Sequence, residues 1–146
     1  MLRLLIIDDS QRRIEMLREW LPGDVHPVSV TSAGRALRML DLDPGKVYAG
    51  ILLDHDLGQQ VVNDAEHGLT GRDVARRIAL RVAPEIPVLV HSMNWLGSSA
   101  MQQALEAAGF SVTRIRFEEL TRERLLDWLE DVRSEWQFRA GDGAEE

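Results

Sequence analysis

The amino-acid sequence predicts a doubly wound α/β fold: a five-stranded parallel sheet of order 2-1-3-4-5 inside a three-layer sandwich. Three observations lead to this prediction. Short apolar runs recur along the chain, a helical segment follows each of them, and 146 residues without internal repeats fit a single domain. Strands that alternate with helices imply right-handed crossovers, and therefore a parallel sheet.

The first half of the chain contains three of the strands. Residues 2–7 are nearly continuous in apolar character, as expected of a strand covered on both faces. Ser10 is the expected N-cap of a helix that Pro22 ends. A weaker, alternating strand covers residues 26–33 and a short helix residues 35–41. The third strand covers residues 47–54 and ends on a carboxylate, Asp54.

The second half begins with the longest loop, because residues 57–71 show no periodicity. We expect a helix over residues 71–82, a buried strand over 86–92, and a helix capped by Ser98 or Ser99 that continues to 108. A fifth strand over 110–117 and a helix capped by Thr121 complete the domain, which covers residues 1–138. Residues 139–146 are expected to form a disordered acidic tail.

Composition narrows the function classes. The absence of cysteine excludes disulfide frameworks, thiolate zinc sites and cysteine nucleophiles. The apolar run at the N-terminus is too short for a signal peptide or a membrane span, so we expect a cytoplasmic protein without a membrane partner. The net charge of −7 repels nucleic-acid phosphates, so a nucleic-acid role would need a local basic patch.

Three carboxylates are predicted to meet at one edge of the sheet. In this strand order the topological switch point lies between the first and third strands, whose carboxyl ends carry Asp8, Asp9 and Asp54. Converging carboxylates repel one another, and a hard divalent cation such as Mg²⁺ or Mn²⁺ relieves that repulsion. The alternative is that Asp8 and Asp9 only cap the first helix beside Ser10.

The motifs LLIIDDS, ILLDHDLG, PVLVHS and a final IRF strand, in this order, resemble a response-regulator receiver domain, whose fold is flavodoxin-like. The resemblance implies that Asp8 and Asp9 bind magnesium, that Asp54 is the phosphoacceptor, and that Ser92 contacts the phosphoryl group. Arg116 falls where receivers carry a lysine. A histidine kinase or another protein is the partner that such a domain implies.

Four features depart from the receiver pattern. Phe117 stands where a proline normally follows the lysine, so the usual cis peptide is lost. Thr113 occupies the position of the aromatic switch residue, and Met93 is bulky enough to narrow access to Asp54. The loop after Asp54 is also longer than a receiver's.

The pairing of DHDLG with HSMNWLGSSAM resembles a divergent receiver branch proposed to process cyclic phosphates, for example at damaged RNA ends. Asp56 and Asn94 would then orient water, and His91 or His55 would supply acid–base catalysis. Strand parity points His91 away from Ser92, so a hydrogen-bonded structural histidine is the alternative.

Arg116 offers a guanidinium that can grip two phosphate oxygens, although a conservative swap of one cation for another is the alternative. Trp95 lies where its ring could wall the pocket and stack on a base. The surplus apolar surface of Trp136 suggests a homodimer.

Three hypotheses follow. The first is a metal-dependent phosphoesterase that processes a cyclic or terminal phosphate on a small molecule or a nucleic-acid end. The second is a phosphoacceptor module of a two-component signalling pathway, with Asp54 phosphorylated. The third is a degenerate receiver that only binds a protein partner.

Overall fold

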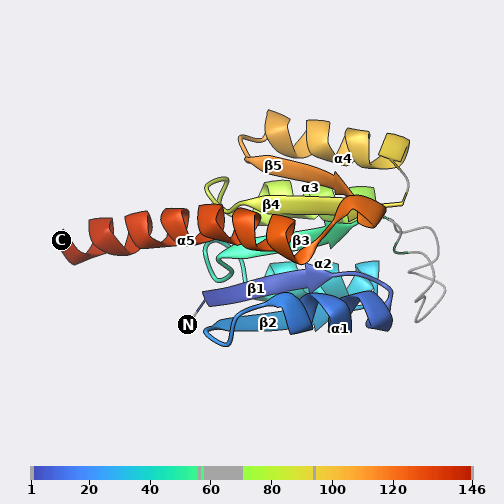
Figure 1. Ribbon diagram of the computed structural model, residues 1–146. Helices are drawn as coiled ribbons and strands as arrows, with labels where there is room; N and C mark the ends of the chain where they lie inside the picture. The colour runs from blue at the N-terminus through green and yellow to red at the C-terminus, as the bar shows by residue number, and fades with distance from the viewer. Residues whose placement is uncertain (1, 56, 58–70, 94, 146) are drawn as a thin grey trace.

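A computed structural model of the chain describes residues 2–55, 57, 71–93 and 95–145. The strands form one parallel sheet in the order β2-β1-β3-β4-β5, as the sequence predicts (Figure 1). They are β1 (Leu2–Ile7), β2 (Val25–Val30), β3 (Gly50–Asp54), β4 (Val88–Ser92) and β5 (Val112–Arg116).

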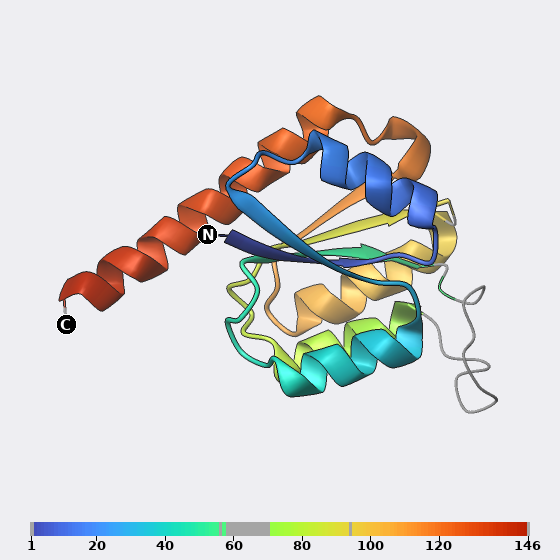
Figure 2. The ribbon, with the colours of Figure 1, turned by 90° about the horizontal axis from the view of Figure 1, so that it is seen from below.

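The sheet lies between two helical layers, each closing its own apolar core. The helices α1 (Gln11–Trp20) and α5 (Arg122–Glu145) cover one face, while α2 (Ala33–Leu42), α3 (Gly71–Arg81) and α4 (Trp95–Ala107) cover the other (Figure 2). Strand residues alternate between the two cores; Leu5 and Ile51 face α2 and α3, whereas Leu4 and Leu52 face α1 and α5. This alternation explains why β1, β3 and β4 read as continuous apolar runs.

The N-cap predicted from the sequence holds for α1 but not for α4. The Ser10 hydroxyl accepts a hydrogen bond from the backbone N–H of Arg13 at 3.3 Å, which confirms Ser10 as the N-cap of α1. The predicted cap at Ser98 or Ser99 is wrong, because α4 already begins at Trp95. Ser98 is buried inside that helix, and its hydroxyl donates to the Trp95 carbonyl at 2.9 Å.

The last helix extends beyond the domain boundary that we expected at residue 138. α5 continues to Glu145 and projects beyond the sheet (Figure 1). Proline is absent from this stretch, so no residue removes a helical backbone donor. The division into a domain of residues 1–138 and a disordered tail of residues 139–146 stays a prediction.

Trp136 is partly buried and packs against the core formed by α1 and α5. The homodimer that we derived from its surplus surface therefore stays a prediction. None of the helices in the described residues combines the length and the apolar character that crossing a membrane requires.

Candidate functional site

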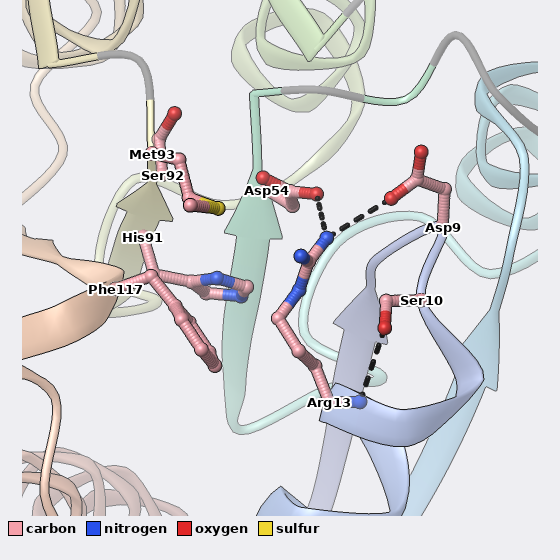
Figure 3. A pocket seen from close by; sticks show the side chains of 8 residues that line it. All are labelled: Asp9, Ser10, Arg13, Asp54, His91, Ser92, Met93 and Phe117. Carbon is pink, nitrogen blue, oxygen red and sulfur yellow. Dashed lines mark hydrogen bonds and ion pairs between the residues drawn. The ribbon is translucent and has the colours of Figure 1, made fainter.

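A pocket of about 240 Å³ opens at the carboxyl edge of the sheet, beyond the ends of β1, β3 and β4 (Figure 3). This edge is the topological switch point of the fold, because β1 pairs with β2 on one side and with β3 on the other. The pocket is lined by Asp9, Ser10, Arg13, Asp54, His91, Ser92, Met93 and Phe117.

Three carboxylates meet here, as the sequence predicts. Asp8 and Asp9 follow β1, and Asp54 ends β3; all three are buried, and each offers an oxygen within 4.8 Å of the others. Asp8 also supports the start of α1, since its Oδ1 accepts the backbone N–H of Ser10, the N-cap residue, at 2.8 Å. A role at the start of the helix and membership of an acidic cluster, which we had set against each other, therefore occur together in Asp8.

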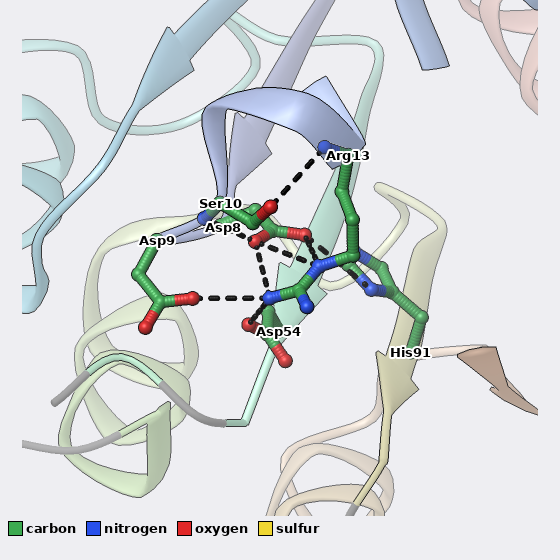
Figure 4. A network of polar contacts seen from close by, with 6 residues as sticks. All are labelled: Asp8, Asp9, Ser10, Arg13, Asp54 and His91. Atoms are coloured by element: carbon green, nitrogen blue, oxygen red, sulfur yellow. Dashed lines mark hydrogen bonds and ion pairs between the residues drawn. The ribbon is translucent and has the colours of Figure 1, made fainter. Parts of the chain in front are cut away.

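Arg13 lies among these carboxylates, and the sequence analysis missed it (Figure 4). Its Nη2 is 2.7 Å from Asp8 Oδ1, 3.0 Å from Asp9 Oδ1 and 3.0 Å from Asp54 Oδ2. Its Nε donates to both carboxylate oxygens of Asp8, at 3.1 and 3.0 Å. The hydrogen bonds that Arg13 donates to Asp8 raise the pKa of Arg13 above its ordinary value, so the guanidinium stays positively charged.

Helix geometry explains how Arg13 reaches the pocket. Arg13 stands in the first turn of α1, and helical side chains lean toward the N-terminus of their helix. That direction leads back to the end of β1 and its two aspartates. The spacing of Asp9 and Arg13, four residues apart, is the sequence signal that would have indicated this pair.

His91 lines the pocket from β4, where it stands in register with Asp54. It is fully buried, and neither ring nitrogen has a hydrogen-bond partner among the described residues. Nδ1 lies 3.8 Å from Asp8 Oδ2, and burial lowers the pKa of His91 to about 4. The imidazole is therefore neutral near pH 7, and the hydrogen-bonded structural histidine favoured by strand parity is not what the described residues show.

Ser92 ends β4 and also lines the pocket, although it is adjacent to His91. Both reach the pocket because it lies at the strand end, where alternation no longer separates neighbours. Met93 follows at the mouth with 72% of its surface exposed. Its predicted effect on access to Asp54 stays a prediction.

Arg116, the predicted phosphate clamp, is not among the residues that line the pocket. It ends β5 in register with Ser92, and its guanidinium carbon lies 4.9 Å from the ring centre of Trp95. Arg114 packs on the same ring at 3.7 Å and donates to the Trp95 carbonyl. Trp95 thus contacts two arginines, and its predicted stacking on a base stays a prediction.

Phe117 takes the place next to the acidic cluster instead. The Arg13 guanidinium lies 5.3 Å from its ring centre, and the His91 ring lies 6.1 Å from it. The described residues contain no cis peptide bond, in agreement with the loss of the proline at this position.

Two predicted site residues, Asp56 and Asn94, lie outside the described residues, so their roles stay predictions. His55 is described, and its carbonyl accepts the backbone N–H of Gly71 at 3.1 Å. A Cβ on Gly71 would lie 2.8 Å from the Asp54 carbonyl, so only glycine lets α3 begin this close to the end of β3.

Comparison with known proteins gives one family. The model described as "Cyclic-phosphate processing Receiver domain" matches residues 3–107, a range that includes the three aspartates, Arg13 and His91 but ends before Arg116. No curated protein matches the sequence.

Solved structures share the fold at low sequence identity. NtrX from Brucella abortus is 18% identical with a TM-score of 0.68; the match covers 99% of this chain but only 30% of NtrX. The response regulator domain of Thermotoga maritima CheB is 19% identical with a TM-score of 0.63, over 92% of this chain and 95% of that domain. A third structure is the receiver domain of the sensor histidine kinase PA1611 from Pseudomonas aeruginosa, which holds a magnesium ion in its active-site cleft. It is 20% identical with a TM-score of 0.62, and the match covers 90% of this chain and 97% of that domain.

Proposed function

Because the chain belongs to the cyclic-phosphate processing receiver domain family, we propose that it hydrolyses a cyclic or terminal phosphate at a site that depends on Mg²⁺ or Mn²⁺. The observation that carries this proposal is the group of three buried carboxylates, two of which line one pocket together with Ser92 and His91. A small molecule or a nucleic-acid end with such a phosphate is the proposed substrate.

The donor set fits a divalent cation. Asp8, Asp9 and Asp54 supply the hard oxygen ligands that Mg²⁺ prefers, and the pocket leaves room for water and phosphate oxygens. The Arg13 guanidinium bonds to all three carboxylates, which shows that their oxygens are arranged to surround a positive charge. A bound ion would neutralise phosphoryl oxygens as a Lewis acid.

The chain's own groups suit a two-step displacement. In the first step the Asp54 carboxylate attacks phosphorus, one ring P–O bond breaks, and the leaving oxygen takes a proton from water. In the second step a water molecule attacks the same phosphorus and gives a proton to the hydroxide left by the first step, the Asp54 carboxylate leaves, and a phosphate monoester is released.

Supporting roles fall to the neighbouring residues. Ser92 would donate to a phosphoryl oxygen, and the imidazole of His91 would hold a water or a phosphate oxygen. Asp56 and Asn94 are proposed to orient the water, and Arg116 to contact the outer part of the substrate.

The signalling alternative uses the same carboxylates, because Asp54 stands where receivers are phosphorylated. A histidine kinase or another protein partner would then set the state of Asp54. A stable aspartyl phosphate distinguishes this function from hydrolysis, in which the adduct is consumed by water.

The same protein samples can test both functions, hydrolysis and signalling. We expect a 2′,3′-cyclic nucleotide to be hydrolysed with Mg²⁺ or Mn²⁺, and Asp54→Asn and His91→Ala to reduce that rate, whereas Asp24→Asn, an exposed aspartate, should leave it unchanged. Intact-protein mass spectrometry after acetyl phosphate and Mg²⁺ should show little adduct. A long-lived phosphoryl adduct on Asp54 without turnover would overturn the proposal in favour of signalling.

Metal binding has its own test. Millimolar Mg²⁺ should raise the melting temperature of the wild type, because a ligand that binds only the folded state stabilises it. Asp9→Ala should abolish the gain. An unchanged melting temperature in both proteins would support the degenerate receiver instead.

A further inference from the structure

Arg13 and a divalent cation would use the same three carboxylates. Nη2 is bonded to one oxygen from each of Asp8, Asp9 and Asp54 at 2.7–3.0 Å. Mg²⁺ binds carboxylate oxygens at about 2.1 Å. An ion coordinated by these oxygens would lie too close to the positively charged Nη2 for both to stay in place.

Charge balance favours keeping both cations in the site. With all four groups ionised, three carboxylates and one guanidinium leave a formal charge of −2, which a divalent ion balances. Arg13 is therefore expected to move within the pocket rather than to leave it. The Arg13 guanidinium packs on Phe117, and 21% of the surface of the Arg13 side chain is exposed, so the group has room to move at the pocket.

The site also needs a positively charged residue that binds the substrate phosphate. Arg116 stands at the position of the receiver lysine, but it packs on Trp95 and does not line the pocket. Arg13 lines the pocket, and a guanidinium can bind two phosphate oxygens at once.

We propose that Arg13 alternates between two anionic partners: it bonds to the three aspartates, and when a divalent cation takes those oxygens it binds the phosphate of the substrate. The phosphate-binding cation of this receiver is thus carried by α1 instead of β5. Metal and phosphate binding are then coupled, since each ligand favours the same position of Arg13. This inference rests on the proposed function for the identity of the phosphate ligand.

Calorimetry with Mn²⁺ and inorganic phosphate tests the coupling. In the wild type, saturating phosphate should tighten Mn²⁺ binding by about tenfold. Arg13→Gln removes the competitor and the phosphate ligand together, so Mn²⁺ should bind more tightly than in the wild type while phosphate affinity falls and the coupling disappears. Arg12→Gln, an exposed neighbour on the same helix, should behave as the wild type.

Arg116→Gln separates the two candidate cations. We expect it to leave Mn²⁺ affinity and the coupling unchanged. Loss of phosphate affinity in Arg116→Gln with no loss in Arg13→Gln would overturn the inference, and so would weaker Mn²⁺ binding in Arg13→Gln, which would show a purely structural arginine.

Arg13→Lys keeps the charge and serves if Arg13→Gln does not fold. It should bind phosphate more weakly than the wild type because the bidentate contact is lost, and equal phosphate affinity would contradict the inference. The result is independent of turnover: coupled binding without hydrolysis would refute the proposed function but not the role of Arg13.

Discussion

Two arginine–aspartate clusters in this molecule use the same chemical groups in opposite surroundings. Arg13 bonds to Asp8, Asp9 and Asp54, whose side chains are at most 4% exposed. Arg133 on α5 forms a bidentate pair with Asp24, at 2.7 and 2.9 Å, and Asp24 is 61% exposed. Arg13 also makes a bidentate contact with Asp8, at 2.7 and 3.0 Å, so the two clusters have similar hydrogen-bond geometry. Water can replace each partner of the exposed pair, whereas the buried carboxylates have little access to water.

Because the geometry is similar, the difference in burial is expected to decide how much each ion pair contributes to stability. Removing one partner from a buried pair leaves the other charge uncompensated, while an exposed charge is simply hydrated. The following experiments test this difference, beginning with the largest effect.

Arg13→Met should lower the free energy of unfolding by about 2 kcal/mol without added metal. This is below the 3–5 kcal/mol typical of a fully buried pair, because the guanidinium remains partly exposed. Urea denaturation measures the loss, and Arg12→Met on the exposed side of α1 is the matched control. A loss no larger than that of the control would show that the buried carboxylates are hydrated after all.

Asp8→Asn in the Arg13→Met background should recover about 1 kcal/mol of that loss, since one uncompensated buried charge is removed. The asparagine oxygen can still accept the Ser10 backbone N–H, so the start of α1 is preserved. The same urea titration detects the recovery. Further destabilisation by the second substitution would indicate that Asp8 acts through its hydrogen bonds rather than through its charge.

Arg133→Met should lower the thermal midpoint by only a small fraction of the Arg13→Met shift. The Asp24–Arg133 attraction is screened by salt, so the difference from the wild type should shrink in 1 M NaCl, whereas the Arg13→Met effect should persist. Melting curves at low and high salt give both numbers. Equal salt sensitivity of the two variants would remove the distinction between the clusters.

Acidification should remove the contribution of Asp24, the smallest of these effects. Its hydrogen bond from Arg133 lowers the pKa of Asp24 below the ordinary value of 3.8. The folded state thus gains stability that is present above pH 3.8 and is lost as the pH falls through the lowered pKa. The stability difference between the wild type and Asp24→Asn should vanish over that range; a difference independent of pH would assign the effect to something other than charge.

The fold and the acidic cluster could be predicted from local patterns. Apolar runs of strand length separated by helices determine a parallel sheet, and the carboxyl ends of its first and third strands must then converge. The positions of Asp8, Asp9 and Asp54 follow from the backbone alone, because each stands at or just after a strand end. The N-cap role of Ser10 could also be predicted from the local sequence, since an N-cap residue hydrogen-bonds to its own helix.

The positions and partners of long side chains depended on the tertiary structure. An arginine has several rotatable bonds, and its guanidinium binds the most favourable anion within reach, which depends on segments distant in sequence: Asp54 is 41 residues from Arg13. For the same reason Arg116 could be placed at the end of its strand but not on Trp95. The sequence alone determined where the backbone brings negative charge together, and only the packing of α1 and β5 around that point decided which arginine lies there.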